Sequence, residues 1–213
     1  MPISFPILYP ILDASTIPPT GREEFLHRLG CSLADAGVTL LEYRNKSGAD
    51  EELLADAAVL RAALPAGQVR LVLDDQVDLV EQAGFDGVHV DDGDVTPAEA
   101  RRILGADRIV GTFGGSENLI PGILQAPADY FSIGPIFPTR TKQTTKVAIG
   151  VDGVRKLRAQ AGVGPVLVAA AGVTLATAAQ VLAAGASVVA VSEALFRQAD
   201  PAAEFRRWMA ELG

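Results

Sequence analysis

An α/β fold, a single-domain (β/α)₈ TIM barrel covering residues 1–213, is predicted by three observations on this sequence. Short apolar runs recur about every 20–30 residues, which gives roughly eight strand–helix units. These runs are continuous rather than alternating, as expected of parallel strands that are covered on both faces. Ala- and Leu-rich stretches with helical spacing lie between the runs, without a linker. The expected strands are residues 7–12, 39–43, 69–73, 87–90, 109–112, 130–133, 166–170 and 187–191.

The stretches between the strands carry the boundary signals of crossover helices. In residues 51–64 the leucines and alanines share one face, with charged side chains opposite. Thr96 and Pro97 are suited to the start of a helix over residues 98–104, and Gly105 is suited to its end. The other expected helices are residues 23–36, residues 175–184, a helix beginning at residue 151 and a last helix containing Phe205 and Trp208.

The main alternative fold is an open, doubly wound sheet. Its usual signature is a G-x-G-x-x-G turn directly after the first strand. The corresponding segment here is Leu12-Asp13-Ala14-Ser15, which has no glycine. The barrel is therefore the favoured fold, near the lower end of the usual length range for that class.

Composition and charge narrow the class of protein. With 49% hydrophobic and 21% charged residues, the chain is not intrinsically disordered. A net charge of −8 argues against a nucleic-acid or membrane-surface binder that relies on a general basic field. The lone Cys31 excludes an internal disulfide, the first residues lack the basic region of a signal peptide, and no apolar run suits a membrane span. We expect a cytoplasmic protein with small-molecule partners; a homodimer is left open.

Charged side chains follow the second, third and fourth expected strands. Arg44 and Lys46 are two residues apart, so both point to the same side if the strand extends through them. Asp74 and Asp75 end the third strand and the run 91–94 follows the fourth, and carboxylate oxygens from these two places suit Mg²⁺. Each residue alone would more often be a turn or a solvated surface charge. Because active sites of this fold lie at the carboxyl ends of the strands, their coincidence predicts a diphosphate–Mg²⁺ site.

A second anion site is predicted beyond the sixth, seventh and eighth strands. Residues 134–150 contain threonines, cations and flanking glycines, and a stretch this long without an obvious element is usually functional. Gly172 and Ser192 follow the last two strands, where backbone amides often bind phosphate in barrels. The alternative for residues 134–150 is a polar linker. We interpret His89, at the end of the fourth strand, as a hydrogen-bonded core histidine that supports the site.

Several segments resemble thiamine phosphate synthase, in the same order along nearly the whole chain. The matching segments are residues 8–13, 42–46, 87–89, 134–142, 171–174 and 191–194, and G-P-I-F-P-T-R-T-K is the most specific. The resemblance implies a barrel enzyme that joins 4-amino-2-methyl-5-hydroxymethylpyrimidine diphosphate to 4-methyl-5-(2-hydroxyethyl)thiazole phosphate and releases diphosphate. A pyrimidine methyl cation would form and be captured by the thiazole nitrogen. By resemblance, Arg44, Lys46 and Lys142 hold the diphosphate, and Asp75 and Asp94 hold Mg²⁺. By the same resemblance, the thiazole phosphate is held by Thr139, Thr141, Gly172, Val191 and Ser192. Glu42 and Asp74 belong to the substrate site.

The chain departs from the family pattern at several positions, among them the segment Gly114-Gly115-Ser116, which replaces a histidine of the family. Glu42 stands where the family usually has Gln, Asp74 where it has Asn, and Phe113 where it has Ser. If Glu42 and Asp74 both line the mouth as carboxylates, they add to the charge of Asp75 and Asp94 and increase the need for Mg²⁺. Two alternatives to the synthase stay open: a thiazole tautomerase-like isomerase, and a catalytically weakened paralogue that binds thiazole phosphate or thiamine phosphate.

Overall fold

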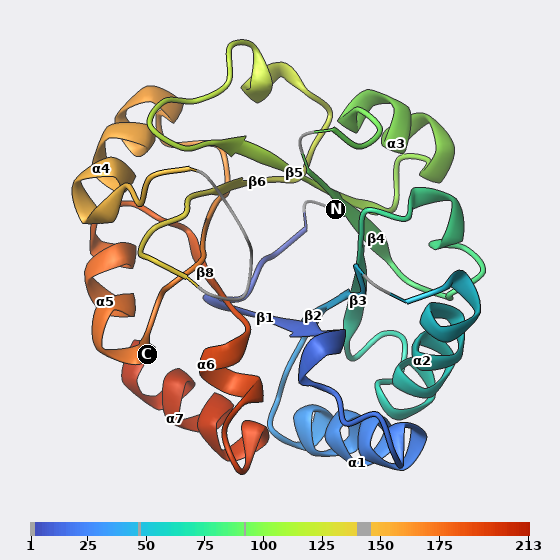
Figure 1. The fold of residues 1–213 in the computed structure, drawn as a ribbon. Coiled ribbons are helices and arrows are strands. Elements are labelled where there is room, and N and C mark those ends of the chain that lie inside the picture. Colours follow the sequence, from blue (N-terminus) through green and yellow to red (C-terminus); the bar gives the residue numbers. More distant parts are fainter. Residues whose placement is uncertain (1–2, 47, 92, 140–145) are drawn as a thin grey trace.

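The computed structural model describes residues 3–46, 48–91, 93–139 and 146–213. Its strands form one closed barrel in the order β1 to β8, and every neighbouring pair is parallel. The helices surround the strands (Figure 1). The predicted barrel is thus confirmed. The strands are β1 Leu8–Asp13, β2 Leu40–Arg44, β3 Arg70–Asp74, β4 Gly87–Val90, β5 Ile109–Gly115, β6 Tyr130–Ile133, β7 Leu167–Ala170 and β8 Val188–Val191.

The connections differ in length around the barrel. Where a full helix was expected after every strand, β3 is followed by the short 3-10 turn Val77–Leu79 and β5 by Ile123–Gln125. The predicted cap of the fourth crossover is confirmed, since the Thr96 side chain accepts a hydrogen bond from the Glu99 amide. The helices are α1 Arg22–Asp35, α2 Asp50–Ala63, α3 Pro97–Leu104, α4 Gly150–Ala161, α5 Leu175–Ala183, α6 Glu193–Phe196 and α7 Pro201–Leu212.

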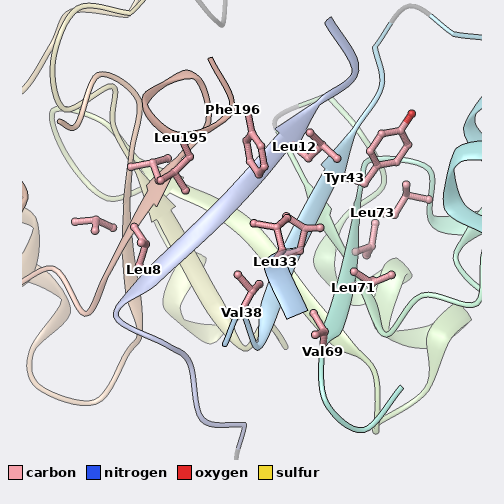
Figure 2. Close-up of a cluster of buried hydrophobic side chains, with 14 of the residues drawn as sticks. Leu8, Leu12, Leu33, Val38, Tyr43, Val69, Leu71, Leu73, Leu195 and Phe196 are labelled. Atoms are coloured by element: carbon pink, nitrogen blue, oxygen red, sulfur yellow. The ribbon is translucent and has the colours of Figure 1, made fainter. Parts of the chain in front are cut away.

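Two hydrophobic clusters hold the barrel together. The larger one lies between the strands and the helices; Figure 2 shows part of it, including Leu12, Tyr43 and Leu73 from adjacent strands and Leu33 from α1. Trp208 of α7 belongs to it and is buried. The smaller cluster fills the barrel interior. Its buried members are Tyr9, Leu40, Val72, Ile109, Tyr130, Val168, Val188 and Ala190.

Three strands continue one residue beyond their predicted ends, through Asp13, Arg44 and Asp74. Side chains alternate along a strand, so Glu42 and Arg44 point into the barrel while Tyr43 packs outside. The inward polar residues are therefore part of the strand ladder rather than of the loops. No helix in the described part of the chain is long and apolar enough to cross a membrane.

Candidate active site

A cavity of about 1060 Å³ opens at the carboxyl ends of the strands. It reaches from the loops down to Tyr9, Glu42 and Tyr130 in the barrel interior. Most of the predicted site residues that the structure describes line this one cavity. They are Glu42, Arg44, Lys46, Asp74, Asp94, Thr139, Gly172, Val191 and Ser192.

The two β2 cations lie against carboxylates at the ends of β1 and β3. Arg44 pairs with Asp13, and its Nε lies 3.5 Å from Asp74 Oδ2. Lys46 Nζ lies 3.0 Å from the same Asp74 oxygen and also pairs with Asp75. The predicted convergence of Arg44 and Lys46 on the barrel mouth is confirmed. Because both cations already face acids, an incoming anion must compete with these acids for them.

The acidic residues gather in a different combination from the expected one. Carboxylate oxygens of Asp74, Asp75 and Asp91 all lie within 4.8 Å of one another. Asp94 lines the same cavity, but its Oδ2 accepts a hydrogen bond from the Asp91 amide at 2.8 Å. The structure thus brings Asp75 together with Asp74 and Asp91, whereas Asp94 closes the loop that carries Asp91. The acidic run after β4 was expected beside the acids after β3, and Asp91 is the member of that run that lies with them, whereas the resemblance had singled out Asp94.

Backbone strain marks both sides of the cavity mouth. Among the described non-glycine residues, Asp75 after β3 and Ala171 after β7 have a positive φ, each 69°. Such conformations are unfavourable for residues with a side chain and persist where the surrounding structure imposes them. Both residues follow strands at the end of the barrel where the site lies.

The part of the mouth beyond β7 and β8 is built from backbone and small side chains. Gly172 has φ +73°, and a Cβ there would lie 2.5 Å from the Phe137 carbonyl oxygen, so glycine is required. Ser192 Oγ is buried and has no hydrogen-bond partner among the described residues. An unsatisfied buried hydroxyl is costly unless a ligand or water completes it. Thr141 and Lys142, predicted to complete this side, lie outside the described residues.

Glu42 lines the same cavity as Arg44 and Lys46, one inward position deeper along β2 than Arg44. Its side chain belongs to the interior, and the residue is 4% exposed. Burial raises the pKa of Glu42 to about 7, although a hydrogen bond from Tyr9 acts in the opposite direction. Whether Glu42 adds its charge to those of Asp74, Asp75 and Asp94 therefore depends on pH.

A buried polar chain surrounds Glu42. His89 Nδ1 lies 3.0 Å from the Tyr130 hydroxyl, which lies 3.3 Å from the Tyr9 hydroxyl. Burial lowers the pKa of His89, but Asp91 and Glu42 outweigh it, and the net shift is upward. The interpretation of His89 as a hydrogen-bonded core histidine agrees with these contacts.

Phe113 lines the cavity at the position where the resembled family has serine. The Lys146 ammonium lies 3.6 Å from its ring centroid, in a cation–π arrangement. The ring therefore contributes apolar surface to the wall and contacts the end of the 134–150 segment.

Behind β2, on the outer face of the barrel, lies a buried ion-pair network that sequence reasoning missed. Arg22 of α1 donates from Nε to Asp56 Oδ1 at 2.8 Å and from Nη2 to Asp56 Oδ2 at 2.6 Å, and the Tyr43 hydroxyl also donates to Asp56. Asn45 Nδ2 lies 3.3 Å from that hydroxyl, and Asn45 Oδ1 accepts from the Gly48 amide at 2.8 Å. The network thus braces the loop that carries Lys46. The sequence could have indicated this network, because Tyr43 and Asn45 alternate along the chain with the inward-pointing Arg44 and Lys46.

Comparisons with known proteins point to one family. Residues 8–195 match the family model described as thiamine monophosphate synthase. A thiamine-phosphate synthase from Koribacter versatilis is 39% identical over 189 residues, which is 89% of this chain and 88% of that protein. One from Agrobacterium fabrum is 36% identical over 182 residues, 82% of this chain and 81% of that protein. The solved thiamine phosphate pyrophosphorylase from Pyrococcus furiosus has the same fold, with a TM-score of 0.77 and 23% identity over 96% of this chain and 94% of that one.

Proposed function

Because this chain belongs to the thiamine monophosphate synthase family, we propose that it is a transferase that makes thiamine phosphate. It joins hydroxymethylpyrimidine diphosphate to hydroxyethylthiazole phosphate and releases diphosphate. One observation carries the proposal: the cation pair Arg44 and Lys46 lines the same cavity as the backbone and hydroxyl around Gly172 and Ser192. Two phosphorylated substrates, one held at each of these places, can meet inside the barrel.

The residues of the chain support a reaction that proceeds by positioning and charge stabilisation. Arg44 and Lys46 face the side where the diphosphate leaves, and their positive charge favours the developing anion. The amides and hydroxyl around Gly172 and Ser192 suit the thiazole phosphate at the other side. Holding the thiazole nitrogen in line with the breaking C–O bond accelerates its attack. No covalent bond to the protein is needed.

The carboxylates at the mouth fit a hard divalent cation. Asp75 Oδ1 is buried and lacks a hydrogen-bond partner in the described structure, and it belongs to the cluster with Asp74 and Asp91. Oxygen ligands of this kind suit Mg²⁺, which would neutralise the diphosphate oxygens when bound. We propose Asp75 as its anchoring ligand, with Asp91 or Asp94 as the second.

A turnover assay tests the proposed activity. The purified protein, Mg²⁺ and both substrates should give thiamine phosphate and diphosphate in equal amounts, with no product when either substrate is omitted. Lys46→Ala should lower turnover strongly, whereas Lys156→Ala, on an exposed face of α4, serves as the control. Conversion of the thiazole substrate alone would favour the isomerase. Binding of thiazole phosphate or thiamine phosphate without turnover would favour the weakened paralogue.

Single substitutions separate the proposed metal ligands. Asp75→Ala should abolish most of the turnover. Of Asp91→Ala and Asp94→Ala, the variant that needs the higher Mg²⁺ concentration for half-maximal rate identifies the second ligand. Full activity in excess chelator would exclude a metal requirement. Lys142→Ala should lower kcat more than it weakens thiazole phosphate binding. The cytoplasmic location and the homodimer stay predictions.

A further inference from the structure

We propose that Glu42 is a catalytic residue whose carboxylate faces the pyrimidine ring and stabilises the positive charge that develops there as the diphosphate leaves. The inference rests on the proposed function. It concerns a residue at which this chain carries an acid where the resembled family usually carries an amide.

The position of Glu42 along β2 places it at the right depth. Glu42 precedes Arg44 by two residues, so the two side chains share the inward face and lie about 6.6 Å apart along the strand. A diphosphate held by Arg44 and Lys46 therefore has its attached ring one step deeper in the barrel. Glu42 lines the cavity at that depth together with Tyr9 and Tyr130.

The surroundings of Glu42 can hold it as a carboxylate. After burial, the positive charge of His89 has the largest effect on its pKa, and Asp74, Tyr9 and Asp91 follow. Arg44 lies on the same inward face of β2, but no Lys or Arg is among the groups that act most strongly on Glu42. The hydroxyl of Tyr9 donates to it, and the Tyr130 hydroxyl and His89 can continue the chain in the same direction. Ionised Glu42 is then the acceptor at the end of the chain.

The chemistry needs a negative charge at this place. When the C–O bond breaks, its electron pair leaves with the diphosphate, and the methylene carbon becomes positive. The ring and its amino nitrogen share that charge until the thiazole nitrogen supplies an electron pair and the C–N bond forms. No proton passes to or from Glu42. A fixed carboxylate in a buried site lowers the energy of this cation more than an amide does.

Glu42→Gln tests the inference because the amide keeps the size of the side chain and removes the charge. At about pH 8, where a group with a pKa of about 7 is ionised, kcat should fall roughly ten- to a hundredfold. The KM values for both substrates should change little. A trifluoromethyl group in place of the ring methyl of the pyrimidine diphosphate destabilises the cation and slows the reaction. This slowing should be larger in Glu42→Gln than in the wild type. Glu117→Gln, at an exposed acid, is the matched control.

The outcomes separate this inference from the proposed function. An inactive wild type would overturn both. An active wild type with unchanged kcat in Glu42→Gln, or with only a raised KM, would overturn the inference alone. If Glu42→Gln does not fold, Glu42→Asp provides the test, because it keeps the charge on a shorter side chain. We expect a lower kcat than in the wild type, while the trifluoromethyl substrate slows both proteins by the same factor. An increased trifluoromethyl effect in Glu42→Asp would contradict the inference.

Discussion

At the scale of single residues, burial determines how the acidic side chains of the site act. Asp74 is 5% exposed and lies near both Arg44 and Lys46, while Glu42 is 4% exposed and the cation that acts most strongly on it is His89. Two acids that replace amides of the resembled family therefore act differently. Asp74 neutralises the cations of the mouth, and Glu42 is held in the interior at the cost of its own desolvation.

The first prediction concerns the pH dependence of stability. Burial raises the pKa of Glu42 from 4.5 to about 7 in the folded protein. Below the lower value both states are protonated and Glu42 contributes nothing. Above about pH 7 the folded state must hold a buried charge, which costs of the order of 3 kcal/mol. Urea unfolding of wild type and Glu42→Gln at pH 5 and pH 8 should show a larger loss of stability in the wild type as pH rises. Parallel losses would contradict the raised pKa.

The second prediction concerns Asp74→Asn. Removal of this charge leaves Arg44 and Lys46 more available to the diphosphate, so less Mg²⁺ is needed to offset repulsion at the mouth. One like charge near a partly buried phosphate matters by about 1 kcal/mol, or roughly a fivefold lower Mg²⁺ concentration for half-maximal rate. The measurement is rate against Mg²⁺ at saturating substrates. Asp78→Asn, at an exposed acid nearby, should leave the curve in place. A curve for Asp74→Asn that coincides with the wild type would mean that Asp74 does not oppose the diphosphate.

At the scale of elements, β2 and the loop after it form the most informative unit. The inward side chains of the strand belong to the site, and its outward side chains anchor it to α1 and α2 through Arg22 and Asp56. The buried Asp56 carboxylate is satisfied by several donors, so the unit is rigid rather than costly. The position of Lys46 is thus set from behind the strand.

The third prediction concerns Gly48→Ala in this loop. A Cβ at Gly48 would lie 2.3 Å from Asn45 Nδ2, so Asn45 must move and the brace beside Lys46 is disturbed. We expect a several-fold higher KM for the pyrimidine diphosphate and an unchanged KM for the thiazole phosphate. Steady-state kinetics with each substrate varied in turn provide the measurement. Gly164→Ala is the matched control, because nothing lies within 4 Å of its Cβ. Equal rises in both KM values would indicate general disorder of the site instead.

At the scale of the whole molecule, the barrel interior carries both stability and function. Its lower part is an apolar layer, and its upper part is the polar cavity. Tyr130 belongs to both: its ring packs edge-on against Tyr9 at a centroid distance of 5.8 Å, and its hydroxyl joins the chain that leads to Glu42. Closure of all eight strands is required to bring β1 and β6 to this contact.

The fourth prediction concerns Gly111→Ala in β5. A Cβ at Gly111 would lie 2.0 Å from Tyr130 Cζ, and the ring has little space in which to move inside the closed barrel. Overpacking of this kind costs about 1–3 kcal/mol. The urea midpoint should fall relative to wild type, and kcat should fall with it because Tyr130 is displaced from Tyr9. An unchanged midpoint would mean that the barrel accommodates the extra methyl group.

The sequence by itself determined the barrel, because continuous apolar runs and amphipathic stretches report burial locally, and each strand carries its own pattern. Arg44 and Lys46 could also be found in this way, since their two-residue spacing on a strand already implies a common direction. Residues at the ends of parallel strands could be assigned to one face for the same reason. The motif between residues 134 and 142 further indicated the family.

Only the tertiary structure decided which of these polar residues meet. Asp91 joins Asp74 and Asp75 because the loop after β4 is closed by Asp94, a contact that no local pattern encodes. The depth of Glu42 follows from the stagger of β2 against β1 and β3. Its pKa follows from the side chains that other strands place around it. Desolvation and charge pairing depend on distances between segments remote in the sequence, and those distances exist only once the barrel has closed.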